Sequence, residues 1–265
     1  MAFFQVQYFS DALMRTTSFH MFLPNDLPAA LTESNPYYTR NTKVIYLLHG
    51  FFGSSMDWVM GSPIWQIAEQ YNIAVVMPSA ENSFYLDGHG TAGRSYGRFI
   101  GEELVAYIRK TFGLLTSRED TIIGGLSMGG FGAIHTGLGY PETFGKIFAL
   151  SAAMIIHEIK NQQPGFETDI AVYDYYKLTF GNLEYLEQSM NNPENLLKIA
   201  IKEKKEIPSI YMTCGKTDSL LEANRQFFNF LVEHQVNATY VEKEGSHDWK
   251  FWSENLETVI RWAID

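Results

Sequence analysis

The residues from 124 to 130 constrain the fold of this chain more than any other stretch. They place Ser127 between two glycines in the spacing Gly125-x-Ser127-x-Gly129, the pattern of a nucleophile elbow. A β-branched run, residues 121–123, precedes the pattern, and a segment that can start a helix follows it. At so sharp a turn the chain packs closely on both sides, so only glycine fits there. The pattern therefore predicts a strand, a tight turn that projects the Ser127 hydroxyl, and a helix whose positive end faces that hydroxyl.

The same short pattern would also suit a glycine-rich turn without any chemical role, because G-x-S-x-G often occurs by chance. The rest of the chain decides between the two interpretations. Apolar runs of strand type alternate with segments of helical periodicity, and we expect such strands at residues 43–48, 73–77, 121–123, 146–151, 209–214 and 238–241. This alternation is typical of an α/β fold with a mainly parallel sheet and helices on both faces.

Two segments depart from this alternation. Residues 3–9 and 17–23 are expected to form an antiparallel pair of strands that leads into the sheet. Residues 152–206 are rich in aromatic and acidic side chains but contain no strong strand pattern. We interpret them as a helical cap inserted between two sheet strands, with a plain surface excursion as the alternative. The whole chain, residues 1–265, is then one domain that carries a cap insertion.

Composition narrows the range of functions. Apolar residues make up 46% of the chain and charged residues 19%, which is enough for a sizeable core. The formal net charge of −10 argues against nucleic acid or an anionic membrane as the main partner. The single cysteine, Cys214, excludes an intrachain disulfide and a cysteine metal site. Because neither a signal-peptide pattern nor a run of transmembrane length is found, we expect a cytoplasmic protein and leave a homo-oligomer open.

A serine hydroxyl is a weak nucleophile, so it needs a neighbouring base, and the base needs an acid to orient it. Asp218 follows the expected strand at 209–214, and His247 follows the last expected strand at 238–241. Carboxyl ends of parallel strands meet at one edge of a sheet, so both side chains should converge on Ser127. The chain order Ser, Asp, His is also the order expected for such a site in an α/β fold.

Other residues compete for the roles of base and acid. Asp248 is adjacent to His247 and should point away from its ring in an extended loop, so we prefer Asp218. None of the other histidines follows both Ser127 and a strand-end aspartate in a loop before the final helix; they are His20, His49, His89, His135, His157 and His234.

A second group of residues should surround the reacting atoms. His49-Gly50 lies at the exit of the strand at 43–48, where a backbone N–H that stabilises an oxyanion is expected. We assign this donor to Phe51, with Phe52 as the alternative. Aromatic residues near the same sheet edge are expected to contact the substrate, namely Phe52, Tyr85 and Trp249.

Five stretches carry a family resemblance: HGFFGSS, SFYLD, GGLSMGGFGA, CGKTDSLLEANRQF and GSHDWKFW. They resemble the esterase D family of α/β-hydrolases, especially its bacterial tributyrin-esterase-like members, over nearly the whole chain. The resemblance implies the α/β-hydrolase fold, with Ser127 as nucleophile, Asp218 and His247 as its partners, and Phe51 and Met128 as the N–H donors. The HGFFG segment departs from the HGLTC-like segment expected of S-formylglutathione hydrolases.

The sequence thus predicts a serine carboxylesterase that acts on small-molecule, short-chain acyl esters and needs no metal or cofactor. Two alternatives remain within enzymes: an esterase for feruloylated or acetylated carbohydrates, and a thioesterase similar to S-formylglutathione hydrolase. A third alternative is an inactive hydrolase fold that serves as a binding module, against which the intact Ser, Asp, His and glycine pattern argues.

Overall fold

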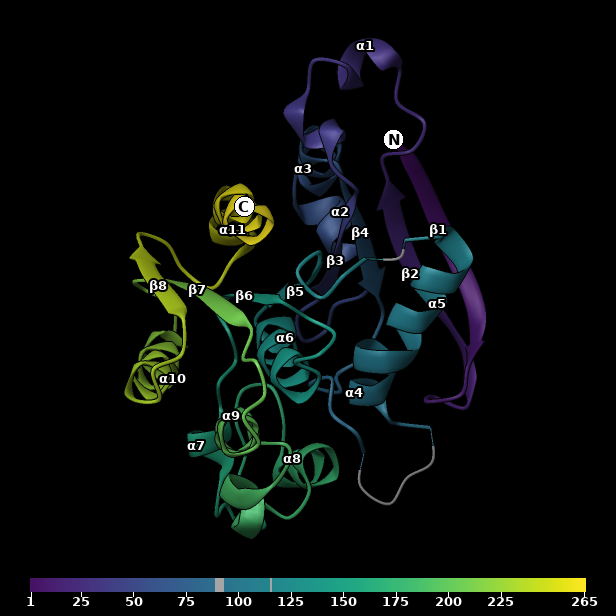
Figure 1. Cartoon of the computed structure of the whole chain (residues 1–265). Coiled ribbons are helices and arrows are strands. Elements are labelled where there is room, and N and C mark those ends of the chain that lie inside the picture. Colours follow the sequence, from purple (N-terminus) through teal and green to yellow (C-terminus); the bar gives the residue numbers. More distant parts are fainter. Residues whose placement is uncertain (89–92, 115) are drawn as a thin grey trace.

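The computed structural model describes residues 1–88, 93–114 and 116–265, so that His89, one of the histidines considered as a base, lies outside the described residues. Within the described ranges, an eight-stranded sheet runs through the molecule in the order β1-β2-β4-β3-β5-β6-β7-β8 (Figure 1). The strands are β1 (Ala2–Ser10), β2 (Arg15–Leu23), β3 (Lys43–Leu48), β4 (Ile73–Pro78), β5 (Thr121–Leu126), β6 (Lys146–Leu150), β7 (Ser209–Gly215) and β8 (Ala238–Lys243).

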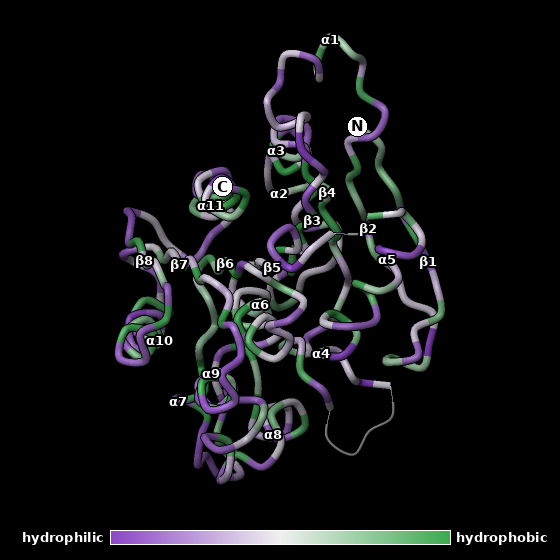
Figure 2. The backbone as a smooth tube through the Cα atoms, in the orientation of Figure 1, coloured by the Kyte–Doolittle hydropathy of each residue, from purple (hydrophilic) through white to green (hydrophobic). Residues whose placement is uncertain are grey.

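The sheet is mainly parallel, as predicted. β1 pairs with β2 and β2 with β4 in antiparallel fashion, whereas the strands from β4 to β8 in the sheet order pair in parallel. The antiparallel lead-in pair is confirmed, and each of its strands has nine residues where seven were predicted. All residues of β4 and β5 are buried. The sequence of β4 is apolar from Ile73 to Met77, as expected for a strand covered on both faces (Figure 2).

Helices cover both faces of the sheet. The described helical elements are α1 (Ala29–Thr32), η1 (Pro36–Thr39), α2 (Asp57–Gly61), α3 (Ile64–Tyr71), α4 (Tyr96–Arg98), η2 (Phe99–Glu103), α5 (Leu104–Phe112), α6 (Met128–Gly139), α7 (Ile156–Ile159), α8 (Tyr173–Phe180), η3 (Leu183–Gln188), α9 (Pro193–Lys202), α10 (Leu221–Glu233) and α11 (Trp249–Ile264). One apolar core gathers α5, α6, α9 and α10, and a second core on the opposite face gathers α2, α3 and α11 (Figure 1).

Two helices have irregular N-terminal ends. α3 begins at Ile64, directly after Pro63, which occupies the N-cap position. α5 is preceded by a π-helical stretch, Phe99–Glu103, before regular α-helix begins at Leu104. Side-chain periodicity does not reveal how the backbone of one turn is hydrogen-bonded, so the sequence could not distinguish the two helix types.

Residues 152–206 run between β6 and β7 and are mostly helical, with α7, α8, η3 and α9. Their aromatic side chains continue the core on the α6 side of the sheet. Phe180 of α8 lies 5.8 Å from the ring of Phe131 in α6 and 4.9 Å from that of Phe84. The segment is therefore packed firmly against the body of the molecule near the carboxyl ends of the strands.

Across the described ranges, none of the helices combines the length and the apolar character needed to cross a bilayer.

Candidate active site

Ser127 lies in the sharp turn between β5 and α6. Its backbone has φ +52° and ψ −120°, a conformation that a residue with a side chain rarely adopts. A Cβ atom on Gly125 would lie 2.4 Å from the carbonyl oxygen of Gly129, and one on Gly129 would lie 2.4 Å from that of Leu48. Both glycines are thus required by close backbone packing, and the structure has the strand, turn and helix that the motif predicted.

A chain of hydrogen bonds leads away from the Ser127 hydroxyl. The Ser127 Oγ lies 3.0 Å from Nε2 of His247, and Nδ1 of His247 lies 3.0 and 3.1 Å from the two carboxylate oxygens of Asp218. An ionised carboxylate only accepts hydrogen bonds, so Nδ1 carries the proton and Nε2 is free to accept one from Ser127. The structure brings together the three residues that the strand-end argument selected.

The Asp218 carboxylate has no exposed surface and accepts a further hydrogen bond, at 2.8 Å, from the Leu220 N–H. Burial alone would raise its pKa, but hydrogen bonds with His247, Ser151 and Leu220 outweigh burial and lower the pKa below the ordinary value. Asp218 therefore stays ionised and can hold the imidazole of His247 in one orientation.

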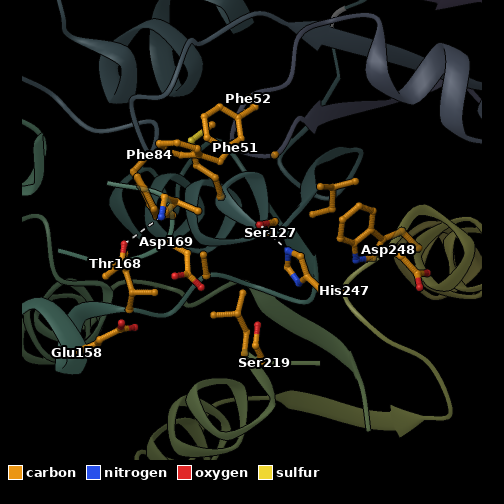
Figure 3. Close-up of a pocket in the computed structure, with 18 of the residues that line it drawn as sticks. Phe51, Phe52, Phe84, Ser127, Glu158, Thr168, Asp169, Ser219, His247 and Asp248 are labelled. Atoms are coloured by element: carbon orange, nitrogen blue, oxygen red, sulfur yellow. Dashed lines mark hydrogen bonds between the residues drawn. The ribbon is translucent and has the colours of Figure 1, made fainter. Parts of the chain in front are cut away.

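Asp248, the alternative to Asp218 as the acid that orients His247, makes a helix-capping hydrogen bond instead. Its carboxylate accepts a hydrogen bond from the Phe251 N–H at 2.9 Å and caps the N-terminus of α11. Figure 3 shows Ser127 and His247 facing each other, whereas the Asp248 carboxylate points away from the His247 ring. The structure agrees with the expectation that this side chain turns away from the imidazole.

The backbone N–H groups near Ser127 differ in whether they already donate a hydrogen bond within the described part of the chain. The Phe52 N–H donates to the side-chain oxygen of Asn82 at 2.8 Å, so it is engaged. The N–H groups of Phe51 and Met128 have no hydrogen-bond partner among residues 1–88, 93–114 and 116–265. Of the two alternatives for the oxyanion donor, Phe51 is thus the residue whose amide remains available.

These groups open into a pocket of about 720 Å³. Its apolar part is formed by aromatic and aliphatic side chains from several separate stretches of the chain: Phe51, Phe52, Phe84, Leu126, Ile155, Ile170, Tyr176, Leu220, Trp249 and Trp252. Four carboxylates lie around it, from Asp57, Glu158, Asp169 and Asp248, and no lysine or arginine is found among its described lining residues. Figure 3 shows Asp169 on the side of the pocket opposite His247.

Phe52 and Trp249 line this pocket as expected, but the structure does not bring Tyr85 into it. Tyr85 is fully buried, and its hydroxyl donates a hydrogen bond at 3.0 Å to the backbone oxygen of His49. The neighbouring Phe84 lines the pocket instead. Both residues have positive φ, 52° for Phe84 and 58° for Tyr85, so simple strand alternation did not indicate which side chain faces inward.

Several pocket residues were missed by the sequence analysis. Thr168, Asp169 and Ile170 belong to an irregular stretch before α8, and Glu158 belongs to the short helix α7. No hydrophobic period or short motif marks them, so the only available signal was their membership of the 152–206 segment.

Trp249 is held in place by its neighbours. Its ring makes edge-to-face contacts with Trp58 and Trp252, each with ring centroids 5.4 Å apart. A Cβ atom on Gly61 would lie 2.5 Å from the Trp249 ring, so glycine is needed there for the ring to lie against the backbone. Trp252 in turn meets the ring of His247 edge-on at 5.0 Å.

A fully formed Ser–His–Asp hydrogen-bond chain at the carboxyl edge of a doubly covered parallel sheet defines a serine hydrolase of the α/β-hydrolase class. Comparison with known proteins gives the same class. The chain matches the model of a family described as "Putative esterase" over residues 10–263. It therefore belongs to this esterase family.

Individual relatives agree with this assignment. The chain is 40% identical to an acetyl esterase of Caldicellulosiruptor saccharolyticus, with 99% of this chain and 98% of the relative aligned. Among solved structures it is similar to FphF, a fluorophosphonate-binding serine hydrolase of Staphylococcus aureus, with a TM-score of 0.84, 26% identity and coverage of 100% and 98%. It is also similar to an S-formylglutathione hydrolase of Staphylococcus aureus, with a TM-score of 0.82, 25% identity and coverage of 100% and 99%.

These findings confirm the predicted fold, family and enzyme class. The protein is a serine carboxylic ester hydrolase, and its substrates are small-molecule esters.

Proposed function

We propose that the protein hydrolyses short-chain acyl esters, acetyl esters above all, through an acyl-enzyme on Ser127. The observation that carries this proposal is the hydrogen-bond chain from Ser127 through His247 to Asp218. Its Ser127 end opens into a pocket, beside two backbone amides that donate to none of the described residues. The 40% identity to an acetyl esterase supports the choice of acyl group.

Each step uses groups of this chain. His247 Nε2 takes the proton of the Ser127 hydroxyl while Oγ attacks the ester carbonyl, and Asp218 stabilises the charged imidazole. The carbonyl oxygen becomes an oxyanion, which accepts hydrogen bonds from the Phe51 and Met128 N–H groups. His247 then gives the proton to the departing alcohol. Water, deprotonated by His247, attacks the acyl carbon and releases the acid from Ser127.

The nucleophile is tested by Ser127→Ala. Loss of the hydroxyl should leave the thermal midpoint close to that of the wild type and lower kcat roughly 10⁶-fold, as removal of the nucleophile does in subtilisin. A fluorophosphonate probe should label the wild type and fail to label the variant. Retention of more than a few per cent of the activity in a clean preparation would exclude Ser127 as the nucleophile.

We further propose that the 152–206 segment acts as a cap that limits the length of the acyl chain. It supplies Ala153, Ile155, Ile170 and Tyr176 to the pocket wall, and Tyr176 is held there by a 2.8 Å hydrogen bond to Thr168. Each methylene that finds room contributes about 0.8 kcal/mol, or ~4-fold in kcat/KM, and one that meets the wall contributes nothing.

We therefore expect kcat/KM for p-nitrophenyl esters to peak between acetyl and butyryl and to fall sharply by octanoyl. Tyr176→Ala should move the optimum to longer chains. Tyr185→Ala is the matched control, because Tyr185 lies in the same segment but is 60% exposed and does not line the pocket. A wild-type optimum at decanoyl or beyond would refute the proposed role of the segment.

The charged side chains around the pocket help to decide between neutral esters and S-formylglutathione as substrates. S-formylglutathione carries two carboxylates and one ammonium group at neutral pH and is a net anion, whereas the described pocket wall offers four carboxylates and no lysine or arginine to pair with its carboxylates. We therefore place neutral esters above S-formylglutathione as substrates. A higher kcat/KM for S-formylglutathione than for p-nitrophenyl acetate would reverse this order.

A further inference from the structure

Two loops meet beside Ser127. Residues 49–53, here called the oxyanion loop, follow β3, and residues 79–85, here called the β4 loop, follow β4. Both loops contain non-glycine residues in the left-handed region of backbone conformation: Phe52 (φ 64°), Glu81 (φ 51°), Phe84 (φ 52°) and Tyr85 (φ 58°). Such conformations persist only where the surrounding contacts hold them, and they concentrate at functional sites.

Three hydrogen bonds join the two loops. The Ala80 N–H donates to Nε2 of His49 at 2.9 Å, and the Tyr85 hydroxyl donates to the His49 backbone oxygen at 3.0 Å. Both of these bonds hold the start of the oxyanion loop. The third bond, from the Phe52 N–H to Asn82 Oδ1 at 2.8 Å, holds the other side of Phe51.

The Asn82 bond fixes the peptide that follows Phe51. The peptide that precedes Phe51 is fixed separately, because its carbonyl, that of Gly50, accepts bonds from His49 Nδ1 at 2.7 Å and from the Gly53 N–H at 3.1 Å. The Phe51 N–H belongs to the peptide whose carbonyl is that of Gly50, and the Asn82 bond holds the next peptide. The backbone of Phe51, and with it the direction of its N–H, is therefore held from both sides. Without the Asn82 bond, the peptide between Phe51 and Phe52 could rotate, and the left-handed conformation of Phe52 would lose a support.

Asn82 also contacts the 152–206 segment. The Tyr175 hydroxyl, from α8, donates to the Asn82 backbone oxygen at 2.7 Å. The Tyr175 ring itself meets the Phe51 ring edge-on, with centroids 5.5 Å apart. Helix α8 therefore contacts the oxyanion loop twice, once directly and once through Asn82.

We propose that the Asn82 side chain is a positioning residue for the oxyanion hole, and that Tyr175 couples this position to the 152–206 segment. The inference rests on the proposed role of the Phe51 N–H. Asn82 is expected to touch neither the substrate nor Ser127. Its effect should consequently appear in stabilisation of the oxyanion and not in binding of the neutral ester.

The test is the kinetics of Asn82→Ala on p-nitrophenyl acetate. A backbone donor displaced by a fraction of an ångström loses much of its effect, so we expect kcat to fall roughly 10- to 100-fold, with KM changed by less than about 3-fold. Asn35→Ala is the matched control. Asn35 Oδ1 also accepts a backbone N–H, that of Tyr37 at 3.0 Å, but it lies in the cap of η1 outside the pocket.

A transition-state analogue gives a second readout that a general loss of structure would not reproduce. Ser127 Oγ adds to the carbonyl carbon of an alkyl trifluoromethyl ketone, His247 takes the hydroxyl proton, and the ketone oxygen becomes an oxyanion in the hole. The inhibition constant of this ketone should rise in Asn82→Ala by about the factor by which kcat/KM falls. The value for Asn35→Ala should equal that of the wild type.

Tyr175→Phe removes a single oxygen atom and serves if Asn82→Ala does not fold. We expect it to lower kcat roughly 3- to 10-fold with KM unchanged. The proposal is overturned if a folded Asn82→Ala retains more than a third of kcat, or if KM and the inhibition constant of the ketone rise together. If only Tyr175→Phe can be measured, a kcat of this variant equal to that of the wild type overturns the proposal. Such results would leave the Ser127→Ala outcome untouched, so failure of this inference and failure of the proposed function are distinguishable.

Discussion

Replacement of Gly129 by alanine tests how far the site depends on close packing between α6 and β3. A methyl carbon there would lie 2.4 Å from the Leu48 oxygen and 2.6 Å from the His49 oxygen, whereas ordinary contacts begin near 3.4 Å. Both obstacles are backbone atoms, one in the last residue of β3 and the other in the residue that follows it. To relieve the closer contact, the helix and the strand must separate by about 1 Å, the difference between 3.4 and 2.4 Å.

The expected loss of stability and activity follows from that separation of helix and strand. Overpacking of a core typically destabilises by 1–3 kcal/mol, and backbone obstacles place this case at about 3 kcal/mol. For a chain of this size, that corresponds to a fall of roughly 6–12 °C in the thermal midpoint. A shift of about 1 Å between Ser127 and the Phe51 amide should also lower kcat on the order of 100-fold.

Gly139→Ala is the matched control in the same helix. Its added methyl would meet only a Leu196 side-chain carbon at 4.0 Å, so no clash arises. Alanine in place of glycine at such a position stabilises a helix by about 0.5–1 kcal/mol, so the midpoint should rise by roughly 1–4 °C with kcat unchanged. Differential scanning calorimetry and p-nitrophenyl acetate kinetics measure both effects. A Gly129→Ala protein as stable and active as the wild type would refute the reasoning.

Further predictions concern the acid, the pH and the cysteine. Asp218→Asn should lower kcat on the order of 10⁴-fold, because the neutral amide no longer stabilises the charged imidazole and its NH2 group favours the wrong tautomer of His247. Asp248→Asn keeps an oxygen for its capping bond and should change kcat less than about 3-fold. The opposite result in steady-state kinetics would make Asp248 the acid. Because the pKa of Asp218 is lowered on folding, the stability it contributes is fully present above the ordinary carboxyl pKa of about 3.9 and is lost as the pH falls through its lower folded value. The thermal midpoint should therefore drop below pH ~4, with a shallower drop in Asp218→Asn. Burial raises the pKa of Cys214 to about 12, so iodoacetamide at pH 8 should alkylate it in the unfolded protein but not in the folded one. Rapid labelling of the native protein, seen by mass spectrometry, would contradict that burial.

The arrangement of the site could be anticipated where sequence position alone decides where a side chain lies. Asp218 and His247 follow strands of a parallel sheet, and the ends of such strands must meet at one edge. The close packing of Gly125 and Gly129 likewise follows from the turn that Ser127 requires. These inferences need only the order of the strands, which apolar runs mark clearly.

The pocket wall could not be anticipated in the same way. Whether Phe84 or Tyr85 lines the pocket depends on two left-handed residues in succession, and no local preference of phenylalanine or tyrosine predicts that conformation. Asp169 comes from an irregular stretch whose position is set by packing of α8 against the core. The choice between Phe51 and Phe52 also needed the structure, because it depends on the Asn82 side chain from another loop.

The tryptophan cluster gives the pocket an intrinsic optical signal. Three of the five tryptophans form this cluster, in which Trp249 contacts both Trp58 and Trp252, and Trp249 and Trp252 line the pocket. Indole emission shifts with the polarity of its surroundings, so arrival of a substrate or loss of water beside Trp249 should alter the fluorescence of the native enzyme. Stopped-flow fluorescence could then follow acylation by esters whose alcohols absorb no visible light, including acetylated sugars that a chromogenic assay cannot see.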